Sequence, residues 1–243
     1  MSFRTRVVFL FVLASAGCGL TDYTVEIANE KALVDYWDKE DKLLSKPIDM
    51  PVLAAKDNGT KKETPKWEVF LRLPQGFDPA PLTIKGKEEA LLLGNILAQY
   101  GSFSNKIGLQ NAYLAVGDDK TDFDKKVYEA FGFLPRDDDK EVTIHRSPTL
   151  VKGSGKSVNQ DLTIKQGLRP IDQAPTYSFN FYKRDAVQVA IVFQMDKGKE
   201  IRSADESIKL SLATLGVGYD QTGVLNDVYK KRNKPLRKKG ARS

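Results

Sequence analysis

Two adjacent runs of alternating apolar residues constrain the fold of this chain more than any other feature. In TYSFNFYK, residues 176–183, aromatic side chains recur at every second position, at Tyr177, Phe179 and Phe181. In AVQVAIVFQM, residues 186–195, apolar residues alternate in the same way. A period of two is typical of β-strands, and the short polar connection between the runs predicts an antiparallel hairpin.

A helix is predicted directly after this hairpin. Ser203 and Glu206 have the spacing of a capping box, in which each side chain bonds the backbone of the other residue. One face of the helix carries Ala204, Ile208, Leu212 and Leu215, and Gly216 ends it. We expect this face to pack against the hairpin, on the side chains of Val187, Val189, Ile191 and Phe193.

The patterns between Trp67 and the hairpin predict further strands and one helix. WEVFLRL (67–73) favours a half-buried strand, and AYLAVGD (112–118) a second strand. A helix is expected from Phe123 to Phe131, capped by Thr121 or Asp122 and ended by Gly132. VTIHR (142–146) and DLTIKQG (161–167) are candidate strands, whereas residues 85–100 fit either a helix or a strand.

A helical extension is predicted ahead of this domain. Between Ala28 and Lys46, the residues Leu33, Trp37 and Leu44 have helical spacing, and Pro47 ends the pattern. Residues 54–66 are polar and rich in turn formers, which indicates a linker.

The order of these elements resembles the PsbP-like fold. The resemblance is carried by LPQGF (73–77), by AYLAVGDDKTDFDKKVYEAFG (112–132) and by the hairpin and helix at 176–216. It implies an α+β domain in which helices pack on an antiparallel sheet, as an α/β/α sandwich. It also implies a noncatalytic binding or assembly role.

The N-terminus has the parts of an export signal. Arg4 and Arg6 precede an apolar stretch from Val7 to Ala14, and small residues lead to Cys18, the only cysteine. The arrangement resembles a bacterial lipoprotein signal, in which Cys18 is acylated, for example with palmitate, and anchors the chain to the cell envelope. The apolar stretch is too short for a membrane span of about 20 residues. Secretion after cleavage behind Ala16 is the alternative.

Positive charge is concentrated at the C-terminus. The chain has a net charge of +6, but residues 18–229 carry −4. We expect the tail to be disordered and to attract anionic lipids or glycans, whereas its lack of aromatic residues argues against nucleic acid. Its basic residues are Lys230, Lys231, Arg232, Lys234, Arg237, Lys238, Lys239 and Arg242.

Motifs for catalysis or metal binding are largely missing from the sequence. His145 is the single histidine, and GSGKS (153–157) lacks the first glycine of a phosphate-binding loop because position 150 is Leu150. We expect no metal or cofactor. The acidic residues Asp118, Asp119, Asp122 and Asp124 depart from calcium-loop spacing, and Asp137, Asp138 and Asp139 are expected to form a solvated turn.

These observations divide the chain into a signal segment (1–17), a lipid-anchored tether with helix and linker (18–66), an α+β domain (67–229) and a basic tail (230–243). The predicted function is a noncatalytic binding or envelope-structural module on the extracytoplasmic side of a membrane. The alternative is an extracytoplasmic hydrolase that uses two carboxylates, although the sequence selects no pair.

Overall fold

The computed structural model describes residues 24–48, 68–84, 96–103, 108–118, 122–146, 161–169, 175–185, 187–196 and 201–232. The chain forms two compact units, Met1–Asp41 and Lys42–Ser243. The second unit confirms the predicted α+β class, with helices packed on an antiparallel sheet. Among the described helices, none combines the length and the apolar character needed to cross a membrane.

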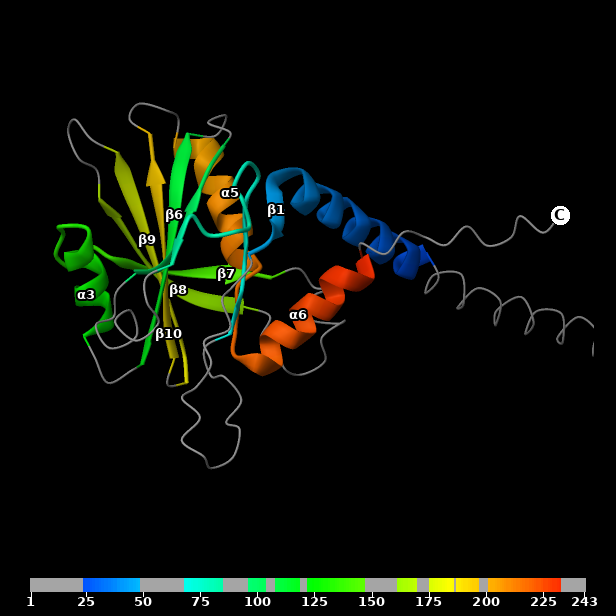
Figure 1. Cartoon of the computed structure of the whole chain (residues 1–243). Coiled ribbons are helices and arrows are strands. Elements are labelled where there is room, and N and C mark those ends of the chain that lie inside the picture. The colour runs from blue at the N-terminus through cyan, green and yellow to red at the C-terminus, as the bar shows by residue number, and fades with distance from the viewer. Residues whose placement is uncertain are drawn as a thin grey trace, which may run out of the picture. The chain divides into compact units, whose positions relative to one another are not determined.

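A seven-stranded antiparallel sheet forms the centre of the second unit (Figure 1). The strand order is β4-β5-β6-β10-β9-β8-β7, so β4 and β7 are the edges. The predicted hairpin is confirmed as β9 and β10, with Phe181 opposite Ala190. The strands are β4 (Thr83–Ile84), β5 (Ile96–Gly101), β6 (Leu109–Asp118), β7 (Lys140–His145), β8 (Asp161–Arg169), β9 (Thr176–Arg184) and β10 (Val187–Met195).

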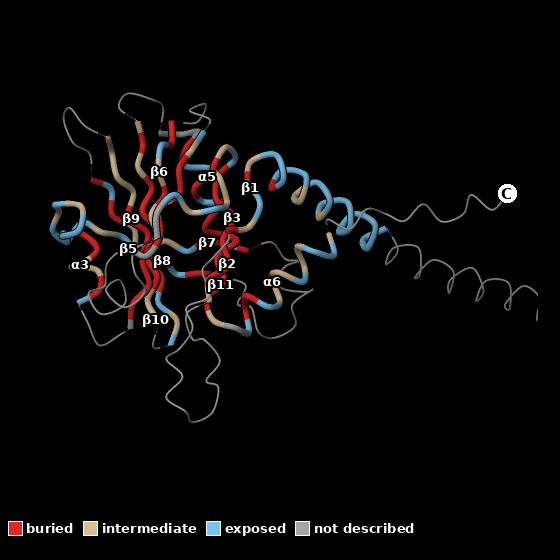
Figure 2. The backbone as a smooth tube through the Cα atoms, in the orientation of Figure 1, coloured by how far each residue is buried: buried red, intermediate tan, exposed pale blue. Residues whose placement is uncertain are grey.

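Helices lie on both faces of this sheet, α3 (Phe123–Ala130) on one and α5 (Ile201–Ala213) on the other. The period of two sends successive side chains of a strand to opposite faces, so both faces have an apolar core. Figure 2 shows the buried segments concentrated in the sheet between these two helices. As predicted, Ile208, Leu212 and Leu215 share one apolar cluster with Val189, Ile191 and Phe193. The opposite cluster joins Phe123, Val127 and Tyr128 to Phe179 and Phe181.

Two short sheets extend the α5 side. β1 (Leu44–Pro47) pairs with β3 (Arg72–Pro74), and β2 (Val69–Phe70) pairs with β11 (Gly216–Val217), which precedes helix α6 (Tyr219–Arg232). The prediction of a half-buried strand at 67–73 is wrong for the described part, because residues 69–74 are all buried. Arg72 is buried because its guanidinium donates to the Ser45 carbonyl (2.8 Å) and lies over the Tyr229 ring.

The ends of the predicted N-terminal helix and of the basic tail need correction. The helix covers residues 24–43, and residues 44–47 form β1 because their backbone pairs with β3. The compact unit therefore begins at Lys42, well before the predicted start at Trp67. Lys230, Lys231 and Arg232 belong to the last turn of α6, where cations interact favourably with the helix dipole, and not to a tail. The linker at 54–66 and residues 233–243 lie outside the described residues.

Candidate functional site

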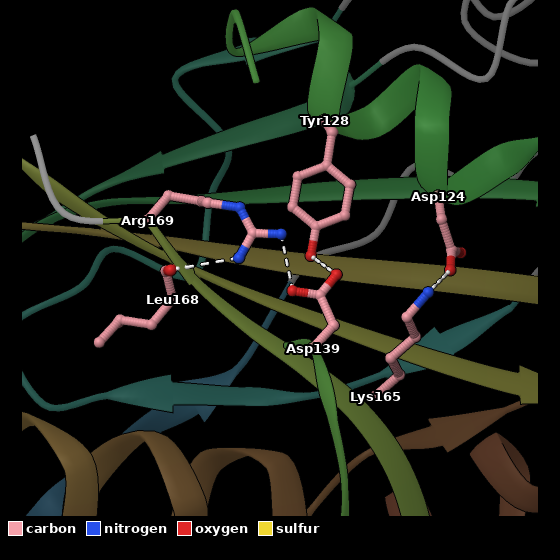
Figure 3. A network of polar contacts seen from close by, with 6 residues as sticks. All are labelled: Asp124, Tyr128, Asp139, Lys165, Leu168 and Arg169. Atoms are coloured by element: carbon pink, nitrogen blue, oxygen red, sulfur yellow. Dashed lines mark hydrogen bonds and ion pairs between the residues drawn. The ribbon is translucent and has the colours of Figure 1, made fainter. Parts of the chain in front are cut away.

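A buried polar network lies between α3 and β8 (Figure 3). Arg169 donates from Nη2 to Oδ1 of Asp139 at 2.6 Å, and the hydroxyl of Tyr128 donates to Oδ2 of the same carboxylate at 2.8 Å. The guanidinium also lies over the Tyr128 ring, 4.6 Å from its centroid. The side chains of Asp139 and Arg169 are each only 1% exposed. This network overturns the expectation that Asp139 lies in a solvated turn, although Asp137 and Asp138 are exposed.

The network is built directly over the backbone of Gly167 in β8. A Cβ at this position would lie 2.2 Å from the Tyr128 hydroxyl and 2.5 Å from Oδ1 of Asp139, which are distances that no side chain can adopt. The lack of a side chain at Gly167 thus makes the space for the ion pair. Burial, followed by the bond to Asp139, raises the pKa of Tyr128 well above its ordinary value of 10.0. These groups are shielded from solvent and bond one another, so the network has a structural role and connects α3 and the loop after it to β8.

The acidic cluster before α3 does not form the predicted helix cap. Asp122 occupies the N-cap position with φ −67° and ψ 63°, and its side chain makes no capping hydrogen bond. A capping residue normally has an extended backbone, which directs its side chain toward the first turn. Asp124 instead pairs with Lys165 at 2.8 Å (Figure 3). Within the described ranges, no group of three or more His, Cys, Asp or Glu residues could hold a metal ion.

His145 lies on the surface at the end of the edge strand β7. Its Nδ1 is 2.8 Å from Oδ1 of Asp161, and the two side chains are 78% and 50% exposed. A solvated pair of this kind, on the flank of the sheet, is a surface contact and not a catalytic dyad.

A polar surface lies on the same face of the sheet as α3, beyond the end of that helix. It consists of five partly exposed side chains, which we call the amide–tyrosine surface. Figure 1 shows that α3 lies below the upper ends of β6, β9 and β10, which carry most of this surface, whereas α5 covers the opposite face. The five residues are Gln99 (β5), Asn111 and Tyr113 (β6), Gln194 (β10) and Tyr177 (β9).

Strand register brings these five residues together. Asn111 is directly opposite Gln194, and Gln194 is directly opposite Tyr177 on the next strand. Oε1 of Gln194 accepts hydrogen bonds from Asn111 Nδ2 (2.8 Å) and from the Tyr113 hydroxyl (3.0 Å). Gln99 Nε2 donates to Asn111 Oδ1 at 3.2 Å. The chain of bonds fixes the amides in place, while Asn111 and Gln194 retain further donor or acceptor positions.

Aromatic rings border this surface on the α3 side. Phe131 contacts Tyr113 edge to face, with ring centroids 5.0 Å apart, and lies 5.3 Å from the Tyr177 ring. Phe133 contacts Tyr177 at 5.7 Å. Burial raises the pKa of Tyr113 and of Tyr177 above 10.0, so both hydroxyls are protonated at neutral pH. The surface thus offers neutral donors and acceptors beside apolar ring faces.

Of the sites predicted from sequence, several cannot be located. Cys18, the GSGKS run at 153–157, Asp119 and the basic residues from Lys234 to Arg242 lie outside the described residues. Sequence reasoning missed both the buried network and the amide–tyrosine surface. A glycine inside a strand, Gly167, was the one signal for the network, because such a glycine often marks close approach of other groups.

No known protein family matches this chain, and no curated protein is significantly similar. A crystal structure of a protein from Bacteroides thetaiotaomicron aligns with 10% sequence identity over 61% of this chain, with a TM-score of 0.34. The aligned part spans 44% of that chain, less than half of its length.

Proposed function

We propose that this chain is a membrane-anchored lipoprotein of the cell envelope whose noncatalytic domain binds a ligand on the amide–tyrosine surface. The observation that carries the proposal is the row of neutral polar side chains on four neighbouring strands, held by mutual hydrogen bonds and still partly exposed. Side chains that are fixed before binding lose little conformational entropy when a ligand arrives.

The chemistry of this surface fits a neutral carbohydrate. Amides and phenols both donate and accept hydrogen bonds, as sugar hydroxyls do. The partly exposed rings of Tyr113 and Tyr177, packed on Phe131 and Phe133, add apolar surface beside the amides, which suits the C–H groups of a pyranose. None of the five side chains carries a charge at neutral pH, so recognition of a charged ligand would need groups from elsewhere.

Binding of the detergent-solubilised mature protein to an array of neutral and acidic glycans tests this proposal. We expect retention on neutral glycans and loss of that binding in Gln194→Ala, because Gln194 accepts the bonds that order Asn111 and Tyr113. Gln110→Ala is the matched control, since Gln110 lies on β6 next to Asn111, is exposed, and bonds Asp196 instead. Absence of glycan binding, or equal binding by both variants, would contradict the proposal.

The finer assignment of the domain to the PsbP-like fold is part of the proposal. It is supported by the placement of α3 and α5 on opposite faces of the antiparallel sheet. It is also supported by the turn after Pro74, where Gly76 has a φ of 99° and Phe77 forms a bridge with Ser102. An experimental structure tests it, because a PsbP-like domain must reproduce the strand order when superposed on members of that fold.

The basic C-terminus is proposed to assist membrane attachment through anionic headgroups or glycans. The support is a set of eight basic residues without an acidic one, which starts in the last turn of α6 and extends to Arg242. Each basic residue near an anionic surface contributes about 1 kcal/mol, and salt screens the effect. Deleting 233–243 should weaken binding of the unlipidated chain to phosphatidylglycerol vesicles at low salt. Equal binding by the full-length and truncated chains would contradict this role.

A further inference from the structure

Three arginines of the second unit are almost wholly buried, and they differ in what they bond. Arg169 is neutralised by Asp139, and Arg72 donates to the Ser45 carbonyl and lies over the Tyr229 ring. Arg146 is 3% exposed and donates from Nη2 to the carbonyl of Leu215. Within the described part of the chain its Nε and Nη1 have no hydrogen-bond partner, and Nε of Arg169 is in the same position. A buried cation with unused donors is costly, so an arrangement of this kind needs an explanation.

Arg146 follows β7 on the face of the sheet that α5 covers, close to Tyr182 and Arg184 of β9. Arg184 donates to the carbonyl of Val217, two residues beyond the carbonyl that Arg146 bonds. Asp220 neutralises Arg184 through two hydrogen bonds of 2.9 and 2.6 Å. Asp185 also lies 3.8 Å from Nε of Arg184, so in this group of described side chains both carboxylates pair with Arg184 and neither bonds Arg146.

The electrostatics of Arg146 agree with this geometry. The pKa of Arg146 is lowered to about 10, chiefly by burial; Tyr182 opposes this shift and the positive charge of Arg184 adds to it. A bound anion would reverse the balance, because an opposite charge at short range favours the protonated guanidinium.

We propose that Arg146 is the recognition residue of a binding site for a single carboxylate group, with Tyr182 at its side. A guanidinium with open N–H groups matches a carboxylate in shape and charge. A single guanidinium with no carboxylate bonded to it suits a monoanion, whereas a phosphate ester carries about −1.5 to −2. The carboxylate can come from a small organic acid or from a peptide, and both share the same chemistry.

This site is independent of the amide–tyrosine surface, because the two lie on opposite faces of the sheet. A failure to bind glycans would therefore not contradict the carboxylate site, and a failure to bind carboxylates would not contradict the amide–tyrosine surface.

Titration of the full mature protein with acetate, and with a short peptide that ends in a carboxylate or in an amide, tests the proposal. Thermal unfolding at constant ionic strength is the readout, since a ligand that binds only the folded state raises the midpoint. We expect a rise with acetate or with the acid peptide, and none with the amide peptide. A response to acetate identifies a small organic acid as sufficient, and a response to the acid peptide alone identifies a peptide partner.

Arg146→Met should abolish the rise. Arg146→Lys should weaken the affinity roughly tenfold or more, because lysine keeps the charge but loses the paired N–H groups of the guanidinium. Arg136→Met is the matched control, since Arg136 is exposed, and it should respond as the original chain does. Without ligand, Arg146→Met should unfold at no lower temperature than the original chain, because a buried unpaired charge is removed. No rise with any carboxylate, an unchanged rise in Arg146→Met, or a failure of both Arg146 variants to fold would overturn the proposal.

Discussion

The carboxylate of Asp139 and the guanidinium of Arg169 lie 2.6 Å apart, although the two residues are thirty positions apart in the sequence and both look like surface residues. Each side chain is 1% exposed, so the pair is held in a low-dielectric environment. It attaches the loop after α3 to the penultimate strand of the sheet, β8.

Asp139→Asn should lower the free energy of unfolding by about 3–5 kcal/mol, because it leaves the Arg169 charge buried without its partner. Chemical denaturation of the purified chain measures the loss. Asp138→Asn, at the exposed neighbouring position, should be neutral within about 0.5 kcal/mol. Similar values for the two variants would show that the ion pair contributes nothing.

Gly167→Ala should cost about 1–3 kcal/mol, because the new methyl group must displace the Tyr128 hydroxyl and the Asp139 carboxylate. Gly223→Ala makes the same chemical change in α6, where nothing lies within 4 Å of the added Cβ. It should stabilise the chain by about 0.5–1 kcal/mol through helix propensity. The two unfolding midpoints should thus move in opposite directions, and a parallel shift would disagree with the geometry at Gly167.

Ile191→Ala should destabilise the chain by about 2–5 kcal/mol, since the Ile191 side chain packs in the core between β10 and α5 and its truncation leaves a cavity. Lys183→Ala, at an exposed position of β9, should change the free energy of unfolding by less than about 0.5 kcal/mol. Equilibrium denaturation of both variants checks the proposed register, which a negligible effect at Ile191 would exclude.

Stability should decrease at alkaline pH because of Tyr128. Its folded pKa is raised above the unfolded value of 10.0, so the folded chain holds the phenolic proton more tightly than the unfolded chain does. The contribution of Tyr128 is complete below pH 10 and is lost as the pH rises toward the folded pKa. In Tyr128→Phe, the free energy of unfolding should fall less steeply at alkaline pH. When the tyrosinate absorbance of the folded variant is titrated, the tyrosine that ionises at the highest pH should be missing. An unchanged slope would mean that Tyr128 titrates normally.

Cys18→Ser should release the protein from membranes, because the proposed lipid anchor is attached to the only thiol of the chain. Fractionation of cells that express the two forms, with mass measurement of the product, checks this. Persistence of the variant in the membrane fraction with unchanged mass would exclude lipidation at Cys18.

The elements that could be predicted from sequence are those whose signal is local. The period of two in β9 and β10 and the helical face of α5 are encoded within each segment, and they fold as expected. β1 could not be predicted, because helical spacing continues to Leu44 and only pairing with a segment far along the chain makes it a strand. Asn111 and Gln194 look like the solvated side of two strands, and their meeting depends on the register between β6 and β10.

The central pairing of the sheet has a consequence for how the chain acquires its structure. β6 and β10 are neighbours in space, yet Asn111 and Gln194 are 83 positions apart in the sequence. The cost in chain entropy of closing such a long loop must be met before the pairing stabilises anything, which slows folding. A nascent chain therefore cannot complete its sheet until the segment 187–195 has been synthesised. Such an unfinished chain would suit the proposed export, because translocation requires a chain that has not yet folded.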